Sequence, residues 1–77
     1  MRSEKELFKL ATDMAFIQSR LEKTYDEWVR EELQEEAEKI RNILLKKNYD
    51  VNKFLYYQDL YKTMTVSEYY EFITTLE

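Results

Sequence analysis

Carboxylates, lysines and tyrosines are the side chains through which this chain could act as a general acid or base, because its 77 residues include neither histidine nor cysteine. Acid–base catalysis by such groups needs a cleft that holds the substrate and adjusts their pKa values. A chain of this length has little room for one. We therefore expect a protein that acts by binding, with no enzymatic activity and no cofactor.

Glutamates at helical spacing are the candidate metal ligands. Glu31 with Glu35, and Glu32 with Glu35, place carboxylates on one side of a helix, where they could hold a hard cation. The Glu-x-x-His pairs of di-iron bundles are missing. Residues 50–52 begin like a calcium loop, but the apolar pair at 54–55 replaces the next ligand and the turn glycine. The sequence predicts no metal site.

Charge is distributed unevenly along the chain, whose net charge is −4. Residues 24–38 carry seven carboxylates and one arginine, whereas residues 39–62 carry six cations and two carboxylates. A row of carboxylates on a rigid helix, which here includes Glu31, Glu32 and Glu35, could mimic the phosphates of a nucleic acid. A solvated helix face has the same composition, and we favour that simpler interpretation.

Basic and aromatic residues interleave after residue 40, a pattern that can stack bases and bind phosphates. The set comprises Arg41, Lys46, Lys47, Tyr49, Lys53, Tyr56, Tyr57, Tyr61 and Lys62. The acidic net charge argues against this use, and the apolar spacing assigns several of these tyrosines to a core or an interface. We do not expect nucleic acid as a partner, and a nucleic-acid mimic or binder is the second alternative function.

Glycine and proline are both absent, which removes the usual chemistry of tight turns and β-hairpins. The sequence therefore predicts an all-α protein with short polar connections. Residues 1–77 suffice for a single small domain, which buries only about 60% of the surface that its unfolded chain exposes. Since no cysteine can supply a disulfide, we expect self-association, as a homodimer, to complete a thin core.

The strongest helical signal covers residues 25–47. Thr24 and Glu27 are spaced as a capping box at its start, and Asn48 is expected to end it in a left-handed conformation. An apolar stripe follows at spacings of three and four residues: Val29, Leu33, Ala37, Ile40 and Leu44. We expect the other segments to pack against this helix.

A first helix is predicted over about 4–23, after a capping box of Ser3 and Glu6. Its apolar residues follow a near-heptad pattern that is widened by further ones: Leu7, Phe8, Leu10, Ala11, Met14, Ala15, Phe16, Ile17 and Leu21. The phase of the apolar pattern changes between this helix and the next. That change predicts a break near residues 22–25 and an antiparallel helical hairpin, with one long bent helix as the alternative.

Two short helices are predicted after the hairpin, at about 51–63 and 66–76. Asp50 caps the first of them, with Tyr49 and Phe54 as a hydrophobic staple. Thr65 and Glu68 form a third capping box before the second. We expect both short helices to pack on the hairpin.

The function that these observations favour is a protein–protein interaction module, a small regulator or inhibitor of the phage or bacterial type that occludes a surface of a larger protein. Small size, acidity, many aromatic residues and few catalytic groups lead to this hypothesis. The residues expected to bind the partner are Trp28, Glu31, Glu32, Glu35, Tyr56, Tyr57 and Tyr70. Trp28 is expected to be half buried near the hairpin turn and to act as an anchor.

A self-associating structural or assembly subunit is the first alternative. Two copies could lay their 25–47 helices antiparallel, so that the acidic half of one lies beside the basic half of the other. No stretch approaches the roughly 20 apolar residues that cross a membrane, and the N-terminus lacks the apolar segment of a signal peptide. We expect a cytoplasmic protein.

Overall fold

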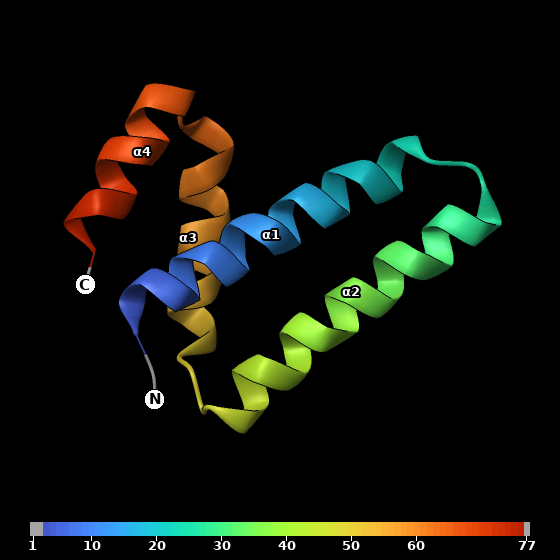
Figure 1. Cartoon of the computed structure of the whole chain (residues 1–77), viewed down its shortest axis with the longest axis horizontal. Helices are drawn as coiled ribbons and strands as arrows, with labels where there is room; N and C mark the ends of the chain where they lie inside the picture. Colours follow the sequence, from blue (N-terminus) through green and yellow to red (C-terminus); the bar gives the residue numbers. More distant parts are fainter. Residues whose placement is uncertain (1–2, 77) are drawn as a thin grey trace.

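The computed structural model describes residues 3–76, which form four helices and no strand (Figure 1). The helices are α1 (Glu4–Lys23), α2 (Glu27–Lys46), α3 (Val51–Thr63) and α4 (Val66–Thr75). The all-α prediction is confirmed, as is the order of two long helices followed by two shorter ones.

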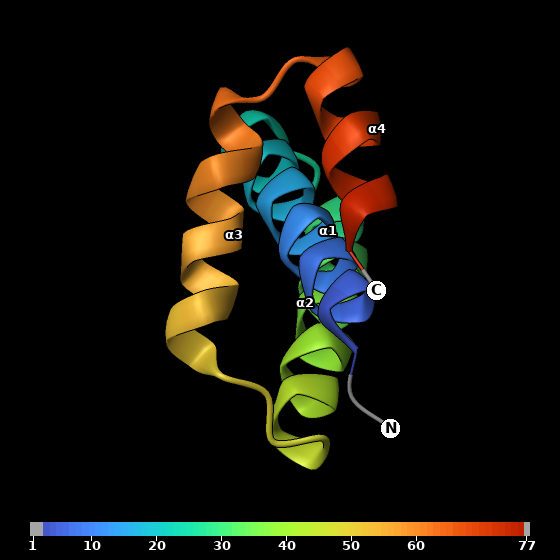
Figure 2. The same cartoon turned by 90° about the vertical axis from the view of Figure 1, so that its left-hand side faces the viewer.

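α1 and α2 form the predicted antiparallel hairpin, whose turn lies at residues 24–26 (Figure 1). The change of apolar phase therefore marks a true reversal of the chain, and the long bent helix is excluded. α3 crosses α1, and after a turn α4 runs back in the direction opposite to α3. The two short helices therefore stand on either side of α1 in Figure 2. The turn of the hairpin projects away from both short helices (Figure 1).

The central helix is α1, and the expectation that α2 would organise the fold is wrong. Eight residues of α1 are buried, namely Leu7, Phe8, Leu10, Ala11, Thr12, Met14, Ala15 and Ile17. Only Ala37, Ile40 and Leu44 are buried on α2. α1 is covered by more than one neighbour and needs a wide apolar face, whereas α2 packs along one side only and needs a narrow stripe.

Aromatic rings join α4 to the rest of the protein. Phe8 is fully buried, and its ring centroid lies 5.3 Å from that of Tyr57 on α3 and 5.5 and 4.9 Å from those of Tyr69 and Phe72 on α4. Tyr61 of α3 adds a further edge-to-face contact to Tyr69. No residue of α4 is itself buried, so its attachment depends on these half-covered rings and on Ile73, which also packs against the core.

The turn between α1 and α2 differs from the predicted capping box. Asp26 is the N-cap of α2 and accepts a hydrogen bond from the amide of Trp28, while Thr24 is the C-cap of α1. The guanidinium of Arg30 donates to the carbonyls of Leu21 (2.6 Å) and Thr24 (3.0 Å). A side chain of α2 thus satisfies carbonyl groups that the end of α1 leaves without a helical partner.

The other helix ends follow the sequence closely. Asn48 has φ 56°, and the amides of Asn48 and Tyr49 donate to the carbonyls of Leu45 and Leu44, the pattern of a Schellman motif. Asp50 caps α3, and Thr65 forms a complete capping box at the start of α4. The left-handed end of α2 and both caps are therefore confirmed.

The central position of Phe8 predicts a large loss of stability on truncation. Phe8→Ala should lower the free energy of unfolding by about 3–5 kcal/mol, because it removes the ring on which α3 and α4 both pack. Phe16→Ala is the matched control on the same helix, since the Phe16 ring is exposed and, within residues 3–76, its one aromatic or cation–π contact is with the guanidinium of Arg20. It should cost less than about 1 kcal/mol. Urea unfolding followed by circular dichroism measures both, and equal losses would contradict the prediction.

Candidate functional site

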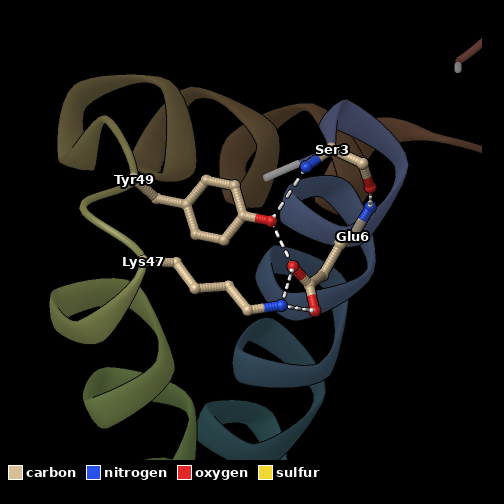
Figure 3. Close-up of polar contacts among 4 residues, drawn as sticks. All are labelled: Ser3, Glu6, Lys47 and Tyr49. Atoms are coloured by element: carbon tan, nitrogen blue, oxygen red, sulfur yellow. Dashed lines mark hydrogen bonds and ion pairs between the residues drawn. The ribbon is translucent and has the colours of Figure 1, made fainter. Parts of the chain in front are cut away.

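A cluster of hydrogen-bonded polar side chains lies at the start of α1 (Figure 3). Both carboxylate oxygens of Glu6 accept hydrogen bonds of 2.8 Å from Nζ of Lys47, and one also accepts from the hydroxyl of Tyr49. The Tyr49 hydroxyl in turn accepts from the backbone amide of Ser3 at 3.1 Å. The Ser3 side chain accepts from the Glu6 amide, so one half of the predicted capping box is present. In the other half, the Ser3 amide donates to the Tyr49 hydroxyl and not to the Glu6 carboxylate.

Glu4, two residues before Glu6, forms a second pair of contacts. Its carboxylate accepts hydrogen bonds from Nζ of Lys53 at 2.9 Å and from the hydroxyl of Tyr57 at 2.8 Å. Together the two glutamates tie the first turn of α1 to the end of α2 and to α3. We call this set the N-terminal clamp: Ser3, Glu4, Glu6, Lys47, Tyr49, Lys53 and Tyr57.

The clamp changes the pKa of several of its members. Hydrogen bonds from Lys53 and Tyr57 lower the pKa of Glu4, and those from Lys47 and Tyr49 lower the pKa of Glu6. Burial, with the Glu4 carboxylate beside it, raises the pKa of Tyr57 to about 12. These shifts favour charged carboxylates and neutral tyrosines, which is the state that the hydrogen bonds require. The clamp therefore fits a role in stability.

A groove lies between α1 and the corner where α3 meets α4. Its volume is about 880 Å³, within the range of ligand pockets. α1 contributes Thr12, Asp13, Ala15, Phe16, Gln18, Ser19 and Glu22, and the corner contributes Tyr61, Lys62, Met64, Thr65, Val66, Tyr69 and Tyr70. The groove thus combines apolar rings with charged groups from both of its sides.

Three large apolar side chains of the groove face solvent. Phe16 is 55% exposed, Tyr70 is 63% exposed and Val66 is also more than half exposed. Partial desolvation raises the pKa of the Asp13 carboxyl, and Lys9 opposes that rise only in part. An apolar surface with an exposed, partly desolvated carboxyl beside it suits a ligand that brings an apolar anchor and a positive charge.

The exposed face of α2 is a second candidate surface. Trp28 is 74% exposed, so the prediction that it is half buried is wrong. Glu31, Glu32 and Glu35 lie within two turns of it, are all exposed, and form no ion pair within residues 3–76. The structure therefore brings four of the predicted partner-binding residues together on one helix.

The predicted tyrosines are placed differently from one another. Tyr70 lines the groove, and Tyr56 is exposed on α3 outside it. Tyr57 is only 5% exposed, packs against Phe8 and donates to Glu4. Tyr57 belongs to the core, so in this structure it cannot form part of a contact surface as the sequence interpretation required.

The basic and aromatic set that could have bound nucleic acid is not assembled into one surface. Tyr49 and Tyr57 are buried, and Lys47 and Lys53 are engaged by the carboxylates of the clamp. The rings of Tyr49 and Tyr57 are therefore not free to stack on bases. Among the described residues, no three carboxylates gather where a metal ion could be held.

Of the three exposed apolar residues of the groove, sequence reasoning misses two as partner-binding candidates. Helical spacing places both Phe16 and Val66 on the apolar faces of their helices. The available signal for Phe16 is Arg20, which follows at i+4 and lies 5.7 Å from the ring centroid, because such a pairing is typical of an exposed ring. Nothing in the sequence distinguishes Val66.

Comparison with protein families, with curated proteins and with solved structures finds no match to this chain. Among the described helices, none is both long enough and apolar enough to pass through a membrane. The assignment of function therefore depends on the surfaces of the protein itself.

The N-terminal clamp predicts a loss of stability in acid. The pKa values of Glu4 and Glu6 lie below the ordinary 4.5 in the folded state, so their contribution is complete above pH 4.5 and is lost as pH falls through the lowered pKa values. The double variant Glu4→Gln, Glu6→Gln should be less stable at neutral pH and should depend less on pH in acid. Urea unfolding at several pH values measures this, with Glu71→Gln on α4 as the control. An unchanged acid limb in the double variant would contradict the role of the clamp.

The pKa of Tyr57 predicts a second loss of stability in alkali. Its folded-state value of about 12 exceeds the ordinary 10.0, so the contribution of the neutral phenol is complete below pH 10 and disappears as pH rises through 12. Tyr57→Phe should remove part of this alkaline dependence. Tyr56→Phe, which alters an exposed neighbour, should not. Unfolding free energies between pH 9 and pH 12 would distinguish the two variants.

Proposed function

We propose that this chain is a non-enzymatic protein-binding module, a small regulator or inhibitor that covers a surface of a larger protein. The observation that supports the proposal is the groove between α1 and the α3–α4 corner, with Phe16, Val66 and Tyr70 exposed along it. Exposed aromatic and apolar side chains within a concave, partly polar surface are the usual anchors of protein interfaces.

The exposed apolar residues are not needed to complete the core. The core cluster contains residues from each of the first three helices, between Leu7 and Tyr57 in the sequence. Residues of α4 pack against it. Within residues 3–76, every buried side-chain nitrogen or oxygen has a hydrogen-bond partner. Apolar surface that remains outside such a satisfied core is available for a partner.

The chemistry of the groove indicates what its partner should present. An apolar side chain would cover the rings of Phe16 and Tyr70. A lysine or arginine beside it would pair with Asp13, and the attraction of that charge would offset the desolvation that raises the Asp13 pKa. The opposite wall carries Lys62, which disfavours a partner that is basic throughout.

Substitutions in the groove should abolish partner capture without unfolding the protein. The full chain would be immobilised on beads and incubated with a lysate of the cells that produce it. The captured proteins would be quantified by mass spectrometry. Tyr70→Ala and Phe16→Ala should each reduce capture of the specific partner at least about tenfold, the loss of a typical anchor. Tyr56→Ala removes an equally exposed ring outside the groove and should leave capture unchanged.

Two results would count against the groove. If Tyr56→Ala reduced capture as much as Tyr70→Ala, the contact would not depend on this surface. If both groove variants captured the same proteins as the unmodified chain, the groove would not be the binding site. Circular dichroism of each variant shows whether the helices remain folded.

A further inference from the structure

The outer face of α2 carries a stripe of six exposed residues, which we call the outer stripe. It consists of Trp28, Glu32, Glu35, Lys39, Asn42 and Lys46. Their spacing alternates between four and three residues, which is the spacing of the contact positions in coiled coils. α2 buries Ala37, Ile40 and Leu44 on its other side, toward the core, so the outer stripe is free to meet another molecule.

We propose that the partner of the outer stripe is the same stripe of a second copy, with the two α2 helices antiparallel around a two-fold axis near the middle of the helix. The first half of the stripe is acidic and the second half is basic, so antiparallel pairing is complementary. In one register, Glu35 faces Lys39 of the second copy, and the symmetry generates the same ion pair twice. Glu32 then faces Asn42, and Trp28 faces Lys46.

Charge selects this register from the others. A shift by one heptad in one direction places Glu32 opposite Glu35 of the second copy, which are like charges. A shift in the other direction leaves Trp28 and Glu32 beyond the end of the second helix. Parallel pairing sets Glu35 against Glu35. Only the proposed register gives every carboxylate of the stripe a cation or an amide to face.

The residues beside the axis are compatible with this arrangement. Glu36 and Glu38 flank the stripe close to the axis and would approach their own copies. Each already forms an ion pair within its own chain, Glu36 with Lys39 at 3.2 Å and Glu38 with Arg41 at 3.0 Å. These pairs reduce the repulsion between the two copies.

The contact is mostly polar, and this determines its strength. Its apolar part consists of Trp28, which can lie against the ammonium group and the alkyl chain of Lys46. Complementary charge fixes register more than it adds affinity. The inference is therefore a weak dimer that salt dissociates, since ions screen exposed charges over about 10 Å at 0.1 M ionic strength.

This dimer goes beyond the proposed function and leaves it possible. The residues of the groove belong to α1, α3, α4 and the connection between the last two, and none belongs to α2. A dimer through α2 would therefore carry two open grooves. A partner that binds the groove would meet a bivalent protein, whose overall affinity for a paired target exceeds that of one site.

Exchange of charges across the axis tests the inference. Sedimentation equilibrium of the full chain at about 0.05 M salt should show a concentration-dependent dimer that weakens at about 0.5 M. Glu35→Lys alone, or Lys39→Glu alone, sets like charges opposite each other twice and should weaken association at least about tenfold. An equimolar mixture of the two single variants should associate again, because the lysine introduced at position 35 of one chain then faces the glutamate introduced at position 39 of the other.

The control is Glu71→Lys, which changes the net charge as Glu35→Lys does but lies on α4. It should leave the dimer unchanged. The inference would be overturned by a protein that stays monomeric at about 1 mM in low salt, by equal effects of Glu71→Lys and Glu35→Lys, or by failure of the mixed variants to associate. Because none of these substitutions touches the groove, their failure leaves the capture experiment unaffected.

Discussion

The burial of α1 on several sides is the constraint on which the rest of the structure depends. Phe8 alone contacts rings from both α3 and α4, and Glu4 and Glu6 join the start of the same helix to the end of α2 and to α3. At the other end, Arg30 closes the hairpin turn. A chain without glycine, proline or cysteine thus fixes its arrangement by enclosing one helix.

Local signals in the sequence were sufficient for the helices themselves. Caps at Ser3, Asp50 and Thr65, and the left-handed residue Asn48, depend on neighbours within a few positions, and such geometry is determined locally. The capping box predicted at Thr24 is absent because Asp26, two residues later, caps α2 instead. The local pattern also shows which side of a helix is buried, but not how many neighbours cover it, so the centrality of α1 was not apparent.

The candidate site shows the same division. The face of α2 that carries Trp28 and the three glutamates could be predicted because it lies on one helix, where spacing alone places residues together. The groove could not, because it is formed by α1 and the α3–α4 corner, which are distant in the sequence. The sequence interpretation places Tyr57 wrongly for a related reason, since the carboxylate that accepts its hydrogen bond belongs to Glu4, 53 positions away along the chain.

The hydrogen bond between Tyr57 and Glu4 spans 53 positions of the chain, and this separation bears on how the protein folds. Closing so long a loop costs entropy before any contact is gained. During synthesis, α1 leaves the ribosome before the residues that enclose it, so its apolar face must wait for α3. α2 follows α1 in the chain and covers one side of that face in the hairpin. We therefore expect the fold to be completed only when the ring of Phe8 meets the rings of α3 and α4.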